Sequence, residues 1–170
     1  MFFHARSGYP SFEFIKGAPW GSLFASIVAR AGWMKGISQF WIRTAAINGL
    51  LAVAAGAFGA HALKTRLAAD RLEVFETAAR YQMYHALALL GVARVAARAP
   101  SHWATASGTA FLVGTAIFSG SLYVYALGGG RVFAMVTPVG GAALLAGWAL
   151  LWPAARKPDR AGLTPGDSDD

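Results

Sequence analysis

The chain has 170 residues, of which 56% are hydrophobic and only 14% are charged, and its mean hydropathy is +0.45. This composition is too apolar for a water-soluble domain of this size and predicts a membrane protein. Cysteine is absent, which excludes disulfides, thiolate metal sites and cysteine nucleophiles, and the net charge of +7 includes no basic run interleaved with aromatics, so we expect no nucleic-acid partner.

Residues 1–33 form an N-terminal extension that differs from the rest of the chain. Their longest uncharged apolar run, residues 21–29, is too short to cross a bilayer. The extension is interpreted as a mis-called start or as an interfacial arm, because Met34 would make a natural start for a membrane domain covering residues 34–153. A signal peptide cleaved near Ala31 is a weaker alternative, because Arg30 fits poorly in a cleavage region.

Four apolar segments follow, each long enough to cross a bilayer as a helix. They cover approximately residues 40–63, 78–97, 103–127 and 132–152. A soluble helix bundle would need polar outer faces, and runs such as AINGLLAVAAGAFGA have none. The sequence therefore predicts an all-α integral membrane four-helix bundle that contacts the lipid bilayer.

The connections between these segments predict how they are joined. Asp70, followed by Glu73, resembles a helix start, so the second span is expected to begin as an interfacial helix near Asp70. GGGR at residues 128–131 predicts a tight turn, which makes spans three and four an antiparallel hairpin. The polar residues 154–170, with two prolines and an acidic end, are predicted to be disordered.

The distribution of basic residues predicts the orientation of the chain. Both tails and the connection between spans two and three carry ten Lys and Arg residues, and the other two connections carry five. Without residues 1–33 the balance is seven to five. Because Lys and Arg are enriched in cytoplasmic loops, we expect a multi-pass protein of the cell (inner) membrane with both termini cytoplasmic.

Polar side chains gather in the half of the spans on the non-cytoplasmic side. The candidate polar cluster is His61, Tyr81, Gln82, His85, Ser121, Tyr123 and Thr137. The candidate helix-packing residues are Gly49, Gly56, Gly59, Pro138, Gly140 and Gly141, and Ala52, Gly56 and Ala60 follow a small-xxx-small spacing. Because spans one and two form a hairpin, His61 and His85 are expected within about two helical turns of the same depth.

Both histidines have structural and functional interpretations. His61 caps the end of the first span, or it lines a pathway together with His85. His85 is interpreted first as a neutral ring that fixes helix register through a hydrogen bond to a tyrosine or serine of a neighbouring span. Two histidines without a third ligand give weak support for a metal, and bis-histidine haem ligation is an unfavoured alternative, so no metal and no cofactor are expected.

Four motifs carry a family resemblance. GAFGAHALK, ETAARYQMYHALALL, FSGSLY and TPVGGAALLAGW resemble the domain of unknown function 423 family, which includes the YgdD-like inner-membrane proteins and transmembrane protein 256. The resemblance covers about residues 35–153 and implies a small four-helix membrane protein without an established activity. Its motif residues here are Gly56, Gly59, His61, Tyr81, Gln82, His85, Ser121, Tyr123, Thr137, Pro138, Gly140 and Gly141. The extension before Met34 departs from the family pattern.

The sequence favours a non-enzymatic structural or accessory membrane component. It contains no recognisable catalytic or nucleotide-binding motif, so we expect no enzyme. The alternative is a small transporter or proton-coupled permease that uses His61 and His85. A transport route needs polar side chains in both leaflets, and the cytoplasmic halves offer little beyond Asn48, Thr109 and Thr115. The expected partners are lipid and either another membrane protein or a second copy of the chain.

The charge bias predicts the outcome of a topology experiment. A reporter fused after Lys157 should be cytoplasmic, and one inserted within residues 64–71 should lie on the opposite side, because the basic tails stay inside. A periplasmic signal at Lys157 would reverse the orientation.

Overall fold

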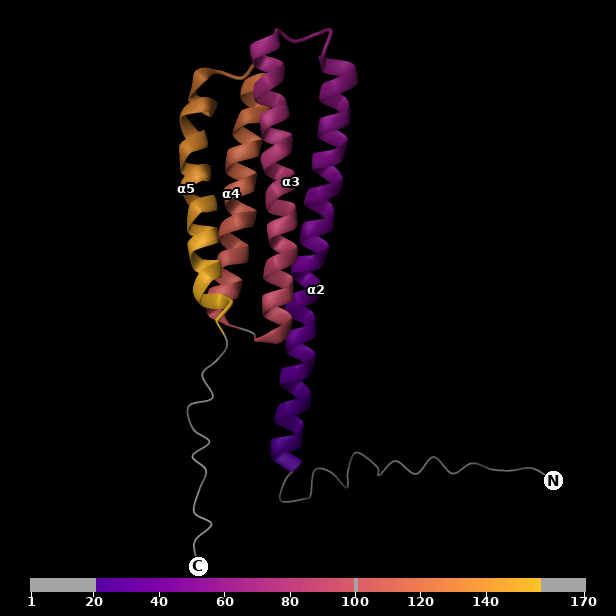
Figure 1. Ribbon diagram of the computed structural model, residues 1–170, viewed down its shortest axis with the longest axis vertical. Helices are drawn as coiled ribbons and strands as arrows, with labels where there is room; N and C mark the ends of the chain where they lie inside the picture. The colour runs from indigo at the N-terminus through magenta and orange to yellow at the C-terminus, as the bar shows by residue number, and fades with distance from the viewer. Residues whose placement is uncertain (1–20, 100, 157–170) are drawn as a thin grey trace, which may run out of the picture.

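The computed structural model describes residues 21–99 and 101–156, and all regular structure in them is helical (Figure 1). The elements are α2 (Gly21–Phe58), the π-helix η1 (Gly59–Leu63), α3 (Ala69–Arg98), α4 (His102–Ala126) and α5 (Arg131–Ala154). The helices run up and down, and each packs mainly on its neighbours in the chain. The all-α membrane bundle predicted from the sequence is confirmed.

Three helices are long and apolar enough to cross a membrane, within the part of the chain that the structure describes. They are Gly36–Leu63, His102–Ala126 and Arg131–Ala154. Helix α3, with 30 residues, is long enough but less apolar than these three, so the fourth predicted span stays a prediction. Because α2 and α4 run in the same direction (Figure 1), α3 must carry the chain back across the same thickness.

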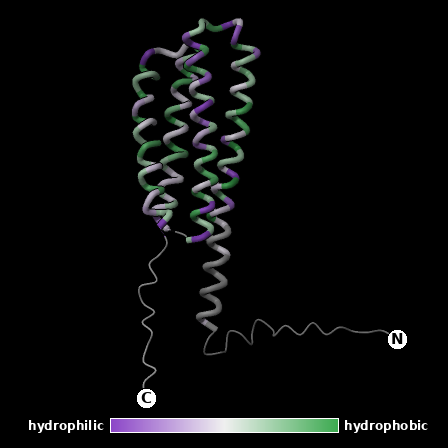
Figure 2. Tube along the Cα trace, viewed as in Figure 1, coloured by the Kyte–Doolittle hydropathy of each residue, from purple (hydrophilic) through white to green (hydrophobic). Residues whose placement is uncertain are grey.

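The bundle covers two of the polar residues of α3, Gln82 and His85. Figure 2 shows hydrophilic positions recurring along α3 at the height of the bundle. Gln82 is 8% exposed and His85 is 5% exposed, whereas Leu50 of α2 and Met135 of α5 are at least 70% exposed. Helix α3 thus directs Gln82 and His85 inward, whereas its Arg80 and Arg94 are exposed, and its neighbours direct apolar side chains outward.

The ends of the helices are fixed by local contacts. Ser101 caps α4, its side chain accepting a hydrogen bond of 3.2 Å from the backbone N–H of Ala104. The predicted turn after α4 is tight, with Gly128 at a φ of +106°. The Arg71 guanidinium donates to the carbonyl of Tyr125 and lies 4.1 Å from the centre of the Tyr125 ring, so a charge from α3 supports the end of α4.

Helix α2 is continuous through the expected domain start at Met34. It has 38 residues, a rise of about 57 Å, and its first part extends beyond the other helices (Figure 1). Residues 1–20 of the extension and residues 157–170 of the tail lie outside the described residues. The interpretation of residues 1–33 as a mis-called start or an interfacial arm therefore stays a prediction.

Glycines allow α4 and α5 to pack with their backbones in contact. A Cβ at Gly140 would lie 2.4 Å from the backbone nitrogen of Phe118, and one at Gly147 would lie 2.6 Å from the Phe111 ring. The Ser107 hydroxyl donates to the Gly147 carbonyl at 2.8 Å. This close approach makes the α4–α5 pair the tightest part of the bundle.

Gly140→Ala should reduce the free energy of unfolding by about 1–3 kcal/mol, because the new methyl group meets backbone that can move only with its helix. Gly141→Ala is the matched control, since a Cβ there would meet Phe118 at an ordinary 3.7 Å. The measurement is unfolding in detergent micelles. Equal stability of the two variants would contradict this account of the α4–α5 contact.

Candidate functional site

The first interhelical polar pair joins Gln82, on the buried face of α3, to Tyr123 of α4. Gln82 and His85 lie three residues apart on one helical face and are both buried. The Tyr123 hydroxyl of α4 donates to Oε1 of Gln82 at 2.8 Å. This hydrogen bond fixes α3 against α4 inside the bundle.

A second polar pair joins α4 to α5. The hydroxyls of Ser121 and Thr137 lie 2.8 Å apart, close enough for either to donate to the other. Each also lies within hydrogen-bond distance of a carbonyl of its own helix, at 3.0 Å for Ser121 and 3.2 Å for Thr137. Among the described residues no hydrogen bond links this pair to Gln82 and Tyr123, so the predicted cluster is two separate pairs.

His85 bonds to its own helix. Its Nδ1 lies 2.8 Å from the carbonyl oxygen of Tyr81. Because a carbonyl can only accept, Nδ1 carries the proton, and Nε2 of the neutral ring is left as an acceptor. The expected bond from His85 to a tyrosine or serine of a neighbouring span is therefore wrong for the residues described here. The helical i, i+4 spacing brings the Tyr81 carbonyl within closer reach than any such side chain.

Aromatic rings from three helices surround His85. The ring of Tyr81 stacks on it at a centroid distance of 6.3 Å and an angle of 25°. Phe111 of α4 lies 5.5 Å from it and Trp148 of α5 lies 6.4 Å from it, between ring centroids. His85 lines a groove of about 730 Å³ between α3 and α5, whose walls include Tyr84, Phe118, Pro138 and Trp148.

The structure separates His61 from His85, contrary to expectation. His61 is exposed in η1. Gly59, the first residue of η1, faces Phe75 of α3. His85 follows Phe75 by ten residues, a rise of about 15 Å. Gly49 of α2 faces Ala86 of α3, which places the neighbouring His85 level with a part of α2 that precedes η1. This contact also separates the two histidines in depth. The two histidines cannot act together at one depth.

The predicted packing glycines divide into close contacts and open positions. Gly59 meets Phe75 and Gly140 meets Phe118, whereas nothing lies within 4 Å of a Cβ at Gly56. Pro138 is exposed and lines the groove. Of the small-xxx-small stripe, Ala52 is buried but Ala60 is exposed, and the buried face of α2 continues from Ala52 back through Ala45 and Trp41.

Several residues of this region were not identified from the sequence. Phe111, Phe118 and Trp148 enclose His85, and Arg71 supports the end of α4. The seven-residue spacing of Phe111 and Phe118, two helical turns, was an available signal that both lie on one face. Trp148 carried no comparable signal, because its partner is two helices away in the chain.

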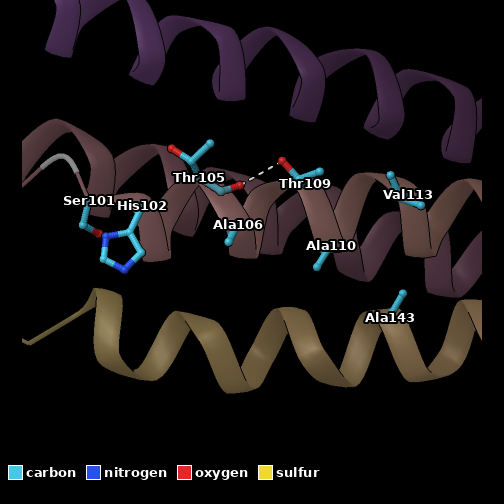
Figure 3. A pocket seen from close by; sticks show the side chains of 8 residues that line it. All are labelled: Ser101, His102, Thr105, Ala106, Thr109, Ala110, Val113 and Ala143. Atoms are coloured by element: carbon cyan, nitrogen blue, oxygen red, sulfur yellow. Dashed lines mark hydrogen bonds between the residues drawn. The ribbon is translucent and has the colours of Figure 1, made fainter.

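A larger cavity of about 810 Å³ lies along the first half of α4, with Ala143 of α5 at its edge. Its lining is mostly small side chains (Figure 3). The hydroxyl of Thr109 is satisfied by the carbonyl of Thr105 at 3.0 Å, as Figure 3 shows. The chemistry of His85 favours the smaller groove between α3 and α5 as the candidate site. Within residues 21–99 and 101–156 no three histidine or acidic side chains gather as metal ligands.

Comparison with known proteins places this region within a described family. A family model described as "Protein of unknown function (DUF423)" matches residues 55–141, which include the whole candidate polar cluster. The UPF0382 inner membrane protein YgdD of Escherichia coli strain K12 is 44% identical over 127 residues, covering 75% of this chain and 97% of that protein.

Relatives in other bacteria are similar over comparable lengths. The UPF0382 membrane protein YwdK of Bacillus subtilis strain 168 is 39% identical over 120 residues, covering 70% of this chain and 98% of that protein. A UPF0382 membrane protein of Staphylococcus epidermidis is 38% identical over 115 residues, covering 66% of this chain and 92% of that protein. No solved structure matches the chain.

The Tyr123–Gln82 pair should show an interaction energy of about 0.6–1.7 kcal/mol in a double-mutant cycle, the range for interhelical hydrogen bonds in membranes. Tyr123→Phe removes the donor and Gln82→Met removes the acceptor while keeping a linear side chain. Unfolding in detergent is measured for the two single variants and the double variant. The cycle between Gln82→Met and Tyr84→Phe is the control and should show no coupling, because Tyr84 is exposed. Additive effects of Tyr123→Phe and Gln82→Met would show that the hydrogen bond does not hold the helices.

Proposed function

The chain belongs to the DUF423 family of membrane proteins, and we propose that it acts in the inner membrane as a non-enzymatic structural or accessory component. The observation that carries this proposal is that the interhelical polar side chains bind one another. Tyr123 pairs with Gln82, and Ser121 pairs with Thr137. Side chains engaged in this way hold helices together and present no reactive group.

The bonding of the remaining polar groups supports the same role. Asn48 donates to the carbonyl of Thr44 at 3.0 Å, and Thr109 donates to that of Thr105 at 3.0 Å. Asn48 and Thr109 are two of the three polar candidates for a path through the cytoplasmic leaflet, and their hydrogen bonds stay within their own helices. The third, Thr115, is buried, and its hydroxyl has no hydrogen-bond partner among the described residues. Catalysis by a nucleophilic side chain would need that side chain to lie beside a general base.

The orientation in this proposal has both termini in the cytoplasm. The start of α2 and the end of α5 lie at the same end of the bundle (Figure 1). The excess of Lys and Arg on that side favours the cytoplasm.

The proposed surroundings are lipid, and the proposed partner is another membrane protein or a second copy of the chain. Large apolar side chains cover the outer faces, with Leu50 70% exposed, Leu145 73% exposed and Met135 74% exposed. Such faces suit lipid or a neighbouring transmembrane helix. A nucleic-acid partner is not part of the proposal.

The geometry counts against the alternative of a proton-coupled transporter that uses both histidines. His61 is exposed in η1, and His85 lies about 15 Å deeper by helix rise. A proton relay between them would need titratable side chains in the intervening turns of α3, and the buried residues there, Ala78, Ala79 and Gln82, do not titrate.

A measurement of proton flux distinguishes the accessory role from a proton-coupled transporter. Proteoliposomes of the wild-type chain should show no more proton flux under a pH gradient than empty liposomes, because the polar groups are structural. His85→Gln should fold with near wild-type thermal stability, since an amide can still donate to a carbonyl. A wild-type flux that disappears in a stable His85→Gln variant would overturn the accessory role, because an amide cannot titrate near neutral pH.

A further inference from the structure

The groove between α3 and α5 contains a hydrogen-bond acceptor that the protein does not use. The bond from Nδ1 to the Tyr81 carbonyl engages the edge of the His85 ring that faces its own helix. Nε2 is separated from Nδ1 by one ring carbon and takes no part in that bond, and the His85 side chain lines the groove. Among the residues that the structure describes, none donates a hydrogen bond to it. The His85 side chain is only 5% exposed, so protein encloses most of the ring that carries this acceptor.

In a bilayer, an acceptor without a donor has an energetic cost. Lipid tails carry no hydrogen-bond donor, and an acceptor left unsatisfied at membrane depth is unfavourable. A molecule that fills the groove and donates one hydrogen bond would remove this penalty.

The walls of the groove indicate the shape of that molecule. The ring centroids of Tyr81 and Trp148 lie 6.3 Å and 6.4 Å from that of His85, and Phe118 lies 4.8 Å from Tyr81 between ring centroids. Aromatic walls pack best against a flat ring in offset or edge contacts. Leu144 and Leu145 extend the groove with aliphatic surface.

The groove is open on the lipid-facing side of the bundle. Tyr84 is 55% exposed, Trp148 is 51% exposed and Leu145 is 73% exposed. These side chains belong to helices that cross the membrane, so the opening faces the bilayer. A ligand would enter sideways from the hydrocarbon.

We propose that this groove binds a lipid-soluble molecule whose flat ring carries a hydroxyl group, of the phenol or hydroquinone class, with the hydroxyl donating to Nε2 of His85. The ring packs among the aromatic walls, and an alkyl substituent follows the leucines toward lipid. An acyl chain fills the aliphatic part but cannot donate to Nε2. The proposal goes beyond the accessory role and does not depend on it.

The test compares two stable probes of nearly equal shape. 4-Octylphenol has the hydroxyl donor, and 4-octylanisole, its methyl ether, has none. Both are titrated into the full chain in nanodiscs with nitrogen-15 in the histidines. The Nε2 resonance of His85 should shift with octylphenol and stay unchanged with octylanisole, and the phenol should bind about tenfold more tightly or better.

Variants assign the effect to the groove. His85→Phe keeps an aromatic ring but removes the acceptor, so the ratio of phenol to anisole affinity should fall to about one. His61→Phe is the matched control and should keep the wild-type ratio, because His61 is exposed in η1. If His85→Phe does not fold, the Nε2 shift in the wild-type chain decides.

Three results would overturn the proposal. The first is equal binding of the two probes to the wild-type chain. The second is a preference for the phenol that survives in His85→Phe. The third is the absence of phenol binding together with disulfide cross-linking between copies through Leu145→Cys, which would assign the groove to a second copy of the chain. The proton-flux assay is independent of all three, so failure here is distinguishable from failure of the accessory role.

Discussion

The architecture depends on shielding one polar helix from lipid. Helix α3 carries Gln82 and His85 on its buried face. Both groups would be costly if they faced hydrocarbon without a partner. Helix α2 covers one side of α3 with small residues such as Ala45 and Gly49, and α4 covers another and supplies the Tyr123 hydroxyl. The apolar side chains of the neighbouring helices are thereby left to face lipid.

The close packing of α4 and α5 explains why a groove remains beside this shielded helix. Gly140 and Gly147 draw α5 onto α4, with the backbone of Phe118 and the ring of Phe111 filling the space where a Cβ would be. Helix α5 therefore makes its main contacts with α4, and it meets α3 mainly through large side chains such as Trp148. Two helices that both pack on a third leave a furrow between them. The aromatic rings around His85 line that furrow without closing it.

Hydropathy and turn chemistry were enough to predict the four helices, their order and the tight turn at Gly128, because each of these follows from local composition. The prediction that His85 lies near the depth of His61 was wrong, because that depth depends on contacts between residues far apart in the sequence. The helix start expected near Asp70 agrees with α3, which begins at Ala69, but the sequence did not predict that Phe75 packs against Gly59 of η1. That contact sets His85, ten residues farther along α3, about 15 Å from the level of η1. Helical periodicity gives the face on which a residue lies, but the axial offset between two helices is set by side-chain contacts such as that of Phe75 with Gly59.

The difference between Gln82 and His85 shows how a buried polar residue with a structural role differs from one with spare bonding capacity. Both lie on the buried face of α3, and the sequence treats them alike. Gln82 accepts a hydrogen bond from another helix, so its polarity contributes to the fold. His85 satisfies Nδ1 through its own helix, which any helical conformation of this segment would allow, and this bond positions no neighbouring helix. A histidine retained only to fix helix register would be expected to use a ring nitrogen across an interface. His85 instead lines the groove between α3 and α5, and none of the described residues donates a hydrogen bond to Nε2, which is why we propose a ligand donor there.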